Sequence, residues 1–176
     1  MGFDMKDNIV LIGFMGVGKT SLGKLLASKL GRPFVDLDEK IERDANMKIP
    51  EIFANHGEKY FRELESAAVK EVSQRRNIVI ATGGGTVKDS ENLRLLKECG
   101  FMVCLTTAPE EIFRRTERKG ERPVLDGGGA ERLETIKKLL AERQPFYSQA
   151  DFEIDTTDWS PLQIVNEICD RFKLQR

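Results

Sequence analysis

Short apolar runs alternate with stretches of helical periodicity along the chain. Five runs have the length and composition of buried strands: residues 8–13, 33–37, 78–81, 101–105 and 152–155. Four other stretches repeat apolar residues at helical spacing: 20–30, 58–74, 131–144 and 161–172. Strands separated by helices predict an α/β fold, a three-layer α/β/α sandwich around a five-stranded parallel sheet.

Boundary residues support two of these helices, and two segments interrupt the alternation. Gly31 follows the first helix, and Ser160 with Pro161 suits the start of the last one. Residues 38–74 are helical throughout, so we expect a substrate-binding insertion at about 37–75 in a single domain, 1–176. Residues 116–130 are polar and glycine-rich, and we expect a mobile lid there.

Composition narrows the function classes. The 176 residues include 28 Lys+Arg and 29 Asp+Glu, and this balance argues against a nucleic-acid or membrane partner that needs a basic surface. The 3 cysteines include no CxxC pair, which argues against disulfides and structural zinc. No stretch resembles a signal peptide or a membrane span. We therefore expect a cytoplasmic protein, and we expect a monomer.

The segment GFMGVGKT at residues 13–20 matches the phosphate-binding P-loop pattern GxxxxGK[ST]. It follows a predicted strand and opens a predicted helix, which is the context the motif requires. Its amides and the helix N-terminus suit phosphate, while Lys19 can reach the β- and γ-phosphates and Thr20 can ligate Mg²⁺. We expect nucleotide binding at Gly13, Gly16, Val17, Gly18, Lys19, Thr20 and Ser21.

A GTPase switch is disfavoured among the nucleotide-binding classes. Residues 126–129 (DGGG) match the DxxG pattern, but no buried strand precedes them. The guanine-reading motif NKxD does not occur in the chain.

Two aspartates follow the second predicted strand. If the backbone stays extended, Asp36 and Asp38 lie on the same side of it, beyond a strand end where α/β proteins bind ligands. Asp36 could serve a magnesium ion beside Thr20, directly or through water, and Asp38 could accept a hydrogen bond from a substrate hydroxyl. The alternative for Asp38 is a helix N-cap.

Arginines and glycines supply further candidates. Arg62 and Glu65 are three residues apart on a predicted helix, and from spacing alone they form either an exposed ion pair or a carboxylate-binding arginine held by a glutamate. Gly83, Gly84 and Gly85 follow a strand and would let a ligand approach the backbone closely. Spacing does not choose among the arginines near the expected lid, which include Arg115, Arg118 and Arg122.

Taken together, these motifs resemble the shikimate kinase family. The resemblance covers nearly the whole chain through GFMGVGKTS, FVDLD, IPEIF, GEKYFRELE, GGGTV, ERPVL and ERQPFY, in this order. It implies a P-loop kinase of the nucleoside monophosphate kinase type. Such an enzyme, part of aromatic amino-acid (chorismate) biosynthesis, passes the γ-phosphate of MgATP to the 3-hydroxyl of shikimate.

The resemblance also implies residue roles. In the half that would bind MgATP (the donor half), Lys19 would contact the phosphates, and Thr20 and, through water, Asp36 would bind the magnesium ion. Arg122 would contact the transferred phosphoryl group, and Arg115 would lie against adenine. In the half that would bind shikimate (the acceptor half), Asp38 would bind the hydroxyls and act as the base. Arg62 and Arg143 would bind the carboxylate, and Glu65 would hold Arg62. The pocket would be lined by Gly83, Gly84 and Gly85.

The sequence differs from the family pattern at two positions, and two alternative functions remain open. Val124 and Phe146 stand where the family often has leucine, and both changes remain apolar. Another small-molecule P-loop kinase, such as a gluconate kinase, would lack Arg62 together with the three glycines. A non-catalytic relative would not need to keep Lys19, Asp36, Asp38 and Arg122.

Overall fold

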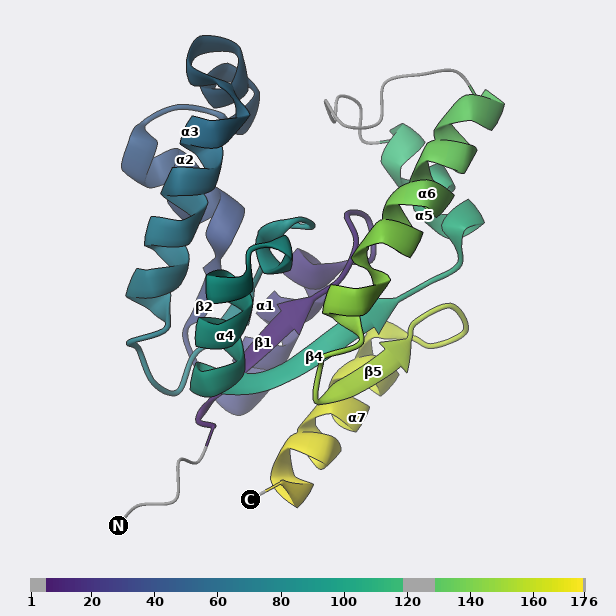
Figure 1. The fold of residues 1–176 in the computed structure, drawn as a ribbon. Coiled ribbons are helices and arrows are strands. Elements are labelled where there is room, and N and C mark those ends of the chain that lie inside the picture. Colours follow the sequence, from purple (N-terminus) through teal and green to yellow (C-terminus); the bar gives the residue numbers. More distant parts are fainter. Residues whose placement is uncertain (1–5, 119–128, 176) are drawn as a thin grey trace.

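The computed structural model describes residues 6–118 and 129–175, and its centre is one parallel sheet (Figure 1). The strand order is β2-β3-β1-β4-β5. The strands are β1 (Asn8–Ile12), β2 (Phe34–Asp36), β3 (Val79–Ala81), β4 (Gly100–Thr106) and β5 (Phe152–Asp155). All four neighbouring pairs are parallel, which confirms the predicted five-stranded parallel sheet.

Helices cover both faces of the sheet. They are α1 (Lys19–Leu30), α2 (Leu37–Ala45), α3 (Ile49–Val72), α4 (Ser90–Cys99), α5 (Pro109–Arg118), α6 (Gly129–Tyr147) and α7 (Pro161–Leu174), with a 3₁₀ turn η1 (Thr86–Lys88). Helices α1 and α7 pack together, as do α3 and α4. Figure 1 shows the α2–α3 pair and the α5–α6 pair standing apart above the sheet.

The predicted boundaries are confirmed at the first and last helices. Gly31 ends α1 in the left-handed conformation, with φ of 64°. Ser160 caps α7, since its side chain accepts a hydrogen bond from the Gln163 amide. Helices α4 and α5 are additional to the four predicted ones.

The prediction of an extended backbone through Asp38 is wrong. Strand β2 ends at Asp36, whose carboxylate accepts a hydrogen bond from the Glu39 amide at 3.1 Å and caps α2. The cap satisfies an amide that the helix itself cannot bond, so the chain turns into a helix at Leu37. Asp38 therefore lies in the first turn of α2, and Asp36, rather than Asp38, is the N-cap.

The segment predicted to be helical without a strand forms α2 and α3. A backbone break at Gly57, with φ 84° and ψ 174°, divides α3. The buried ammonium of Lys40 joins the two helices, because it lies 2.8 Å from Asp44 of α2 and 2.9 Å from Glu71 of α3. Within the predicted lid, residues 116–118 end α5 and 129–130 begin α6, whereas 119–128, including Arg122, lie outside the described residues.

Every residue of β1 is buried, including the polar Asn8 at its start. The Asn8 amide group donates to the Arg75 carbonyl at 2.8 Å, and its oxygen accepts from the Ile78 amide at 3.0 Å. One side chain thus satisfies two backbone groups of the α3–β3 connection and fixes where β3 enters the sheet. Among the described helices, none is both long and apolar enough to span a membrane.

We predict that Asn8→Ala lowers the free energy of unfolding by about 1–3 kcal/mol, because it leaves the buried Ile78 amide and the partly buried Arg75 carbonyl without this partner. Urea unfolding followed by circular dichroism measures this change. Asn55→Ala, at an exposed position on α3, is the matched control and should change stability by less than about 0.5 kcal/mol. Equal stability of the two variants would contradict the assignment.

Candidate active site

The P-loop forms between β1 and α1 as predicted. Gly13 has φ of 143°, and a Cβ there would lie 2.5 Å from the Leu105 carbonyl oxygen of β4, so only glycine fits. Gly18, with φ of 97°, precedes the first residue of α1 and turns the chain into the helix. The loop therefore presents a helix N-terminus at the carboxyl edge of the sheet, where an anion binds well.

Polar side chains of the loop region are already engaged. Lys19 is 9% exposed, and its ammonium donates to the carbonyls of Gly13 at 2.6 Å and Phe14 at 3.0 Å. The Thr20 hydroxyl donates to the Asp36 carboxylate at 2.6 Å. The Val17 side chain is buried, so only its backbone can face a nucleotide, and Ser21 is exposed on α1.

The pair Thr20 and Asp36 suits Mg²⁺. Both residues supply oxygen atoms, which Mg²⁺ prefers, and they meet beside the phosphate loop. No group of three or more His, Cys, Asp or Glu residues is placed to bind a metal within residues 6–118 and 129–175. A metal held by one or two protein oxygens together with phosphate and water fits this arrangement.

Arg115 of α5 reaches the rim of the P-loop. Its guanidinium donates to the Gly16 carbonyl at 3.2 Å and pairs with Glu111 at 2.9 Å. Arg114 and then Arg115 hold the pKa of Glu111 down at about 2, so this carboxylate stays ionised at neutral pH. Arg115 thereby lies at the rim of the P-loop, and its contact with adenine stays a prediction.

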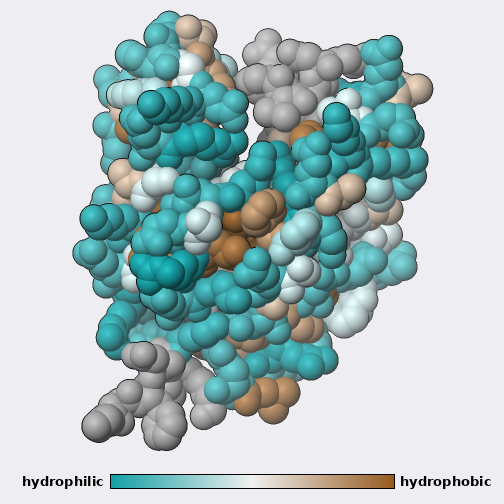
Figure 2. All heavy atoms as spheres, in the orientation of Figure 1, coloured by the Kyte–Doolittle hydropathy of each residue, from teal (hydrophilic) through white to brown (hydrophobic). Residues whose placement is uncertain are grey.

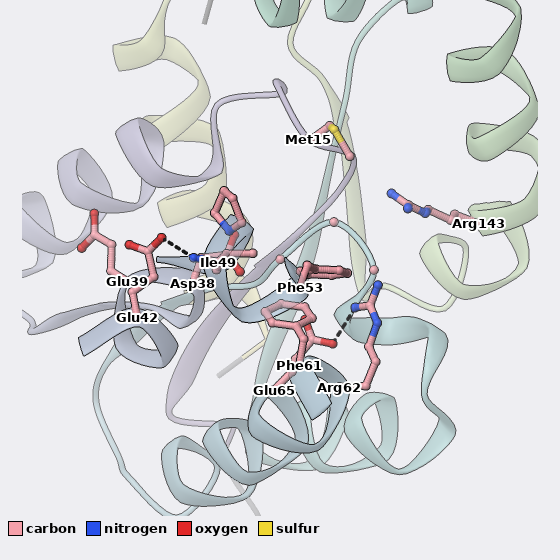
Figure 3. Close-up of a pocket in the computed structure, with 14 residues that line it drawn as sticks. Met15, Asp38, Glu39, Glu42, Ile49, Phe53, Phe61, Arg62, Glu65 and Arg143 are labelled. Carbon is pink, nitrogen blue, oxygen red and sulfur yellow. Dashed lines mark hydrogen bonds and ion pairs between the residues drawn. The ribbon is translucent and has the colours of Figure 1, made fainter. Parts of the chain in front are cut away.

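A second feature, the acceptor cavity, has a volume of about 330 Å³ and lies between α2–α3, the glycine turn 83–85 and α6 (Figure 3). Its polar lining includes Asp38, Arg62, Glu65 and Arg143, four of the predicted site residues. Figure 2 shows a hollow between the two helical pairs, with apolar atoms at its base. The molecule thus combines a concave site with a few convergent charged groups, as small-molecule sites do.

Arg62 and Glu65 form the ion pair predicted from their spacing, and Glu65 is buried. Arg62 donates to Glu65 Oε1 at 2.8 Å, and the Thr86 hydroxyl donates to Glu65 Oε2 at 2.9 Å. Glu65 is 2% exposed, whereas the Arg62 side chain is 36% exposed and faces the cavity. The interpretation as an exposed surface pair is therefore wrong, since the carboxylate holds the arginine from below.

Arg143 enters the cavity from α6, on the other side (Figure 3). It is 4% exposed, and its guanidinium carbon lies 4.9 Å from the centre of the Phe14 ring. Its Nε and Nη1 atoms are buried and meet no hydrogen-bond acceptor in the part of the chain that the structure describes. Leaving such donors unpaired is costly, so they are suited to an anionic ligand.

Asp38 lies where the two halves of the site meet. A smaller cavity of about 90 Å³ adjoins the P-loop and is lined by Lys19, Thr20 and Asp36. Both cavities are also lined by Met15, Asp38, Gly83 and Gly84. A Cβ on Gly83 would lie 3.0 Å from Asp38 Oδ1 and one on Gly84 3.1 Å from Arg143 Nη1, so glycine leaves these polar groups room.

Several lining residues were not assigned to the site from the sequence. Met15, Ile49, Phe53 and Phe61 form an apolar wall, and the rings of Phe53 and Phe61 lie 4.9 Å apart. Periodicity alone assigns Phe61 to the core, because an apolar pocket wall and a core face give the same pattern. The role of Thr86 was also missed, since it depends on a contact with Glu65, 21 residues earlier.

The comparisons agree with this arrangement. A family model described as Shikimate kinase matches residues 15–173. Shikimate kinase of Persephonella marina is 46% identical over 166 residues, covering 94% of this chain and 99% of that protein. A solved structure of shikimate kinase from Acinetobacter baumannii in complex with shikimate is 35% identical, covers 99% of this chain and 97% of its own, and has a TM-score of 0.91.

A gluconokinase structure from Sinorhizobium meliloti shares the fold alone. It is 17% identical with a TM-score of 0.61, covering 97% of this chain and 93% of its own. The family match and the relatives that cover almost the full length separate this chain from such distant neighbours. The chain belongs to the shikimate kinase family.

Proposed function

We propose that this protein transfers the γ-phosphoryl group of ATP to the 3-hydroxyl of shikimate, giving shikimate 3-phosphate and ADP. The main support for the proposal is the wall that the two cavities share. Asp38 belongs to this shared wall, since it lines both the acceptor cavity and the smaller cavity at the P-loop. A residue in this place can contact an acceptor hydroxyl while the donor phosphate lies in the P-loop. The product would enter chorismate and aromatic amino-acid biosynthesis.

The acceptor cavity matches the chemistry of shikimate, which carries one carboxylate and three hydroxyls. Arg62, held by Glu65, and Arg143, with two buried N–H groups, can bind the carboxylate with charge-assisted hydrogen bonds. Asp38 and the amides of Gly83 and Gly84, which line the same cavity, can bind the hydroxyls. The apolar wall of Ile49, Phe53 and Phe61 can cover the ring.

The donor half would hold MgATP. Lys19 would exchange its loop carbonyls for the β- and γ-phosphates, and Thr20 and, through water, Asp36 would hold the metal. When bound, Mg²⁺ neutralises charge on the phosphates. Gly13, Gly16, Val17, Gly18 and Ser21 complete the proposed nucleotide site, with Arg115 near adenine.

In the transfer step, the 3-hydroxyl oxygen forms a bond to the γ-phosphorus, and the bond from that phosphorus to the bridging oxygen of ADP breaks. Asp38 orients the hydroxyl and receives its proton. Lys19 stabilises the charge on the phosphates, and Arg122 is proposed to do the same from the lid. Closure of that lid would exclude water and suppress hydrolysis of ATP.

Further parts of the proposal concern the state of the protein. We infer a cytoplasmic monomer. We also infer that it needs no nucleic acid or membrane, and the near-equal numbers of acidic and basic residues support this second point. A non-catalytic role is disfavoured, because Lys19, Asp36 and Asp38 all reach the site.

Turnover with different acceptors tests the function directly. ADP release, measured in a coupled assay with MgATP, should depend on shikimate and stay at the level of slow hydrolysis with gluconate. The physical reason is the arginine pair, which needs a carboxylate at a fixed distance from the reacting hydroxyl. If the protein phosphorylated gluconate but not shikimate, the proposal would be wrong and a gluconate kinase would be the better assignment.

We predict that Asp38→Asn keeps nucleotide affinity within about twofold but lowers kcat by about 10²–10⁴-fold, the usual contribution of a positioned general base. Steady-state kinetics and calorimetry with an ATP analogue measure the two quantities. Asp170→Asn, the same chemical change at an exposed position of α7, serves as control and should leave kcat unchanged. A near-normal kcat for Asp38→Asn would refute its role.

A further inference from the structure

Tyr147, the last residue of α6, touches the acceptor site without lining the cavity. It is 3% exposed, and its hydroxyl donates to the Gly84 carbonyl at 2.7 Å. This bond joins the end of α6 to the middle of the glycine turn, across 63 residues of sequence. The chain has only one other tyrosine, Tyr60.

The carbonyl groups of the glycine turn are all occupied. Gly83 accepts from the Thr86 amide at 3.3 Å and Gly85 from the Lys88 amide at 3.2 Å, while Gly84 depends on Tyr147. No backbone carbonyl among residues 6–118 and 129–175 accepts a hydrogen bond from the amides of Gly83, Gly84 or Gly85. The turn therefore keeps its donors available at a cavity whose other donors are arginines.

The Tyr147 bond sets the direction of one of these donors. A trans peptide is planar, so its carbonyl and its N–H point in opposite directions, and the described chain has no cis peptide bond. With the Gly84 oxygen held toward the Tyr147 hydroxyl, the Gly85 N–H points away from that hydroxyl. Gly85 adjoins Arg62, since a Cβ there would lie 3.1 Å from the guanidinium nitrogens.

Tyr147 is also four residues after Arg143, so both side chains lie on the same face of α6. Burial raises the pKa of Tyr147 to about 12, against the opposing effect of the neighbouring Arg143 guanidinium. The hydroxyl thus stays protonated, and stays a donor, throughout the neutral range. A single helix end carries both the carboxylate-binding arginine and the group that holds the turn opposite it.

We propose that Tyr147 is a positioning residue for the acceptor: its hydrogen bond to the Gly84 carbonyl fixes the Gly84–Gly85 peptide and so aims the Gly85 amide toward the side of the cavity where Arg62 binds the acceptor carboxylate. The inference rests on the proposed function, because shikimate is the acceptor it assumes. It assigns Tyr147 no contact with the substrate.

The test is Tyr147→Phe, which removes the hydroxyl and keeps the ring in its buried place. Loss of one hydrogen bond should weaken shikimate binding by about 3- to 12-fold in calorimetry, while affinity for an ATP analogue alone stays within about twofold. Tyr60→Phe, which removes the hydroxyl of an exposed tyrosine on α3, is the matched control and should bind both ligands normally.

A purely structural role gives different results. With a purely structural role, Tyr147→Phe would lower the melting temperature and leave shikimate affinity unchanged, or it would weaken the binding of shikimate and of the ATP analogue equally. Either outcome overturns the proposal. Wild-type protein that does not bind shikimate would instead overturn the proposed function, so the two failures are distinguishable.

A second measurement uses a protein that retains the Tyr147 hydrogen bond, so it also works if Tyr147→Phe does not fold. The Tyr60→Phe variant has a single tyrosine, so labelling it with 3-fluorotyrosine places fluorine only at Tyr147. Its ¹⁹F resonance should shift when shikimate is added without nucleotide and should not shift with gluconate. A resonance that shikimate leaves unmoved would contradict the proposal.

Discussion

The acceptor half of the site depends on one buried carboxylate. Both oxygens of Glu65 are engaged, Oε1 by Arg62 of α3 and Oε2 by Thr86, which follows the glycine turn. Burying a carboxylate that is only 2% exposed is costly without such partners, so the pairing stabilises the fold as well as shaping the site. Because Glu65 joins the helix to the turn, it fixes the separation of the two walls between which shikimate is proposed to bind.

The donor half is held in shape by its own contacts. Lys19 is bonded to two loop carbonyls, Thr20 to Asp36, and Arg115 to Gly16 at the rim. Lys19 is proposed to exchange these carbonyls for phosphate oxygens, whereas Thr20 and, through water, Asp36 are proposed to hold the metal. These contacts hold the charged groups beside the P-loop before nucleotide binds, and such preorganisation favours catalysis. Asp38 lines both cavities and is proposed to act on the acceptor hydroxyl where they meet.

Much of this architecture could be predicted from the sequence, because local patterns determine it. The apolar runs gave the sheet, and the P-loop was recognisable since all its residues are contiguous. The helix start at Leu37 was missed, because an Asp followed by Leu and Asp suits a strand end as well as a cap. The burial of Glu65 and the contact of Tyr147 with Gly84 could not be predicted, since both depend on residues distant in sequence that only the packed fold brings together.

The central claim is that Glu65 acts on the acceptor through Arg62. A double-mutant cycle of Arg62→Ala and Glu65→Gln, with shikimate affinity measured by calorimetry, tests it most directly. Each single variant should bind shikimate at least about tenfold more weakly, and the double variant little worse than Arg62→Ala alone, a coupling of at least about 1 kcal/mol. Additive effects, or a Glu65→Gln variant that binds shikimate as tightly as the wild type, would contradict the account.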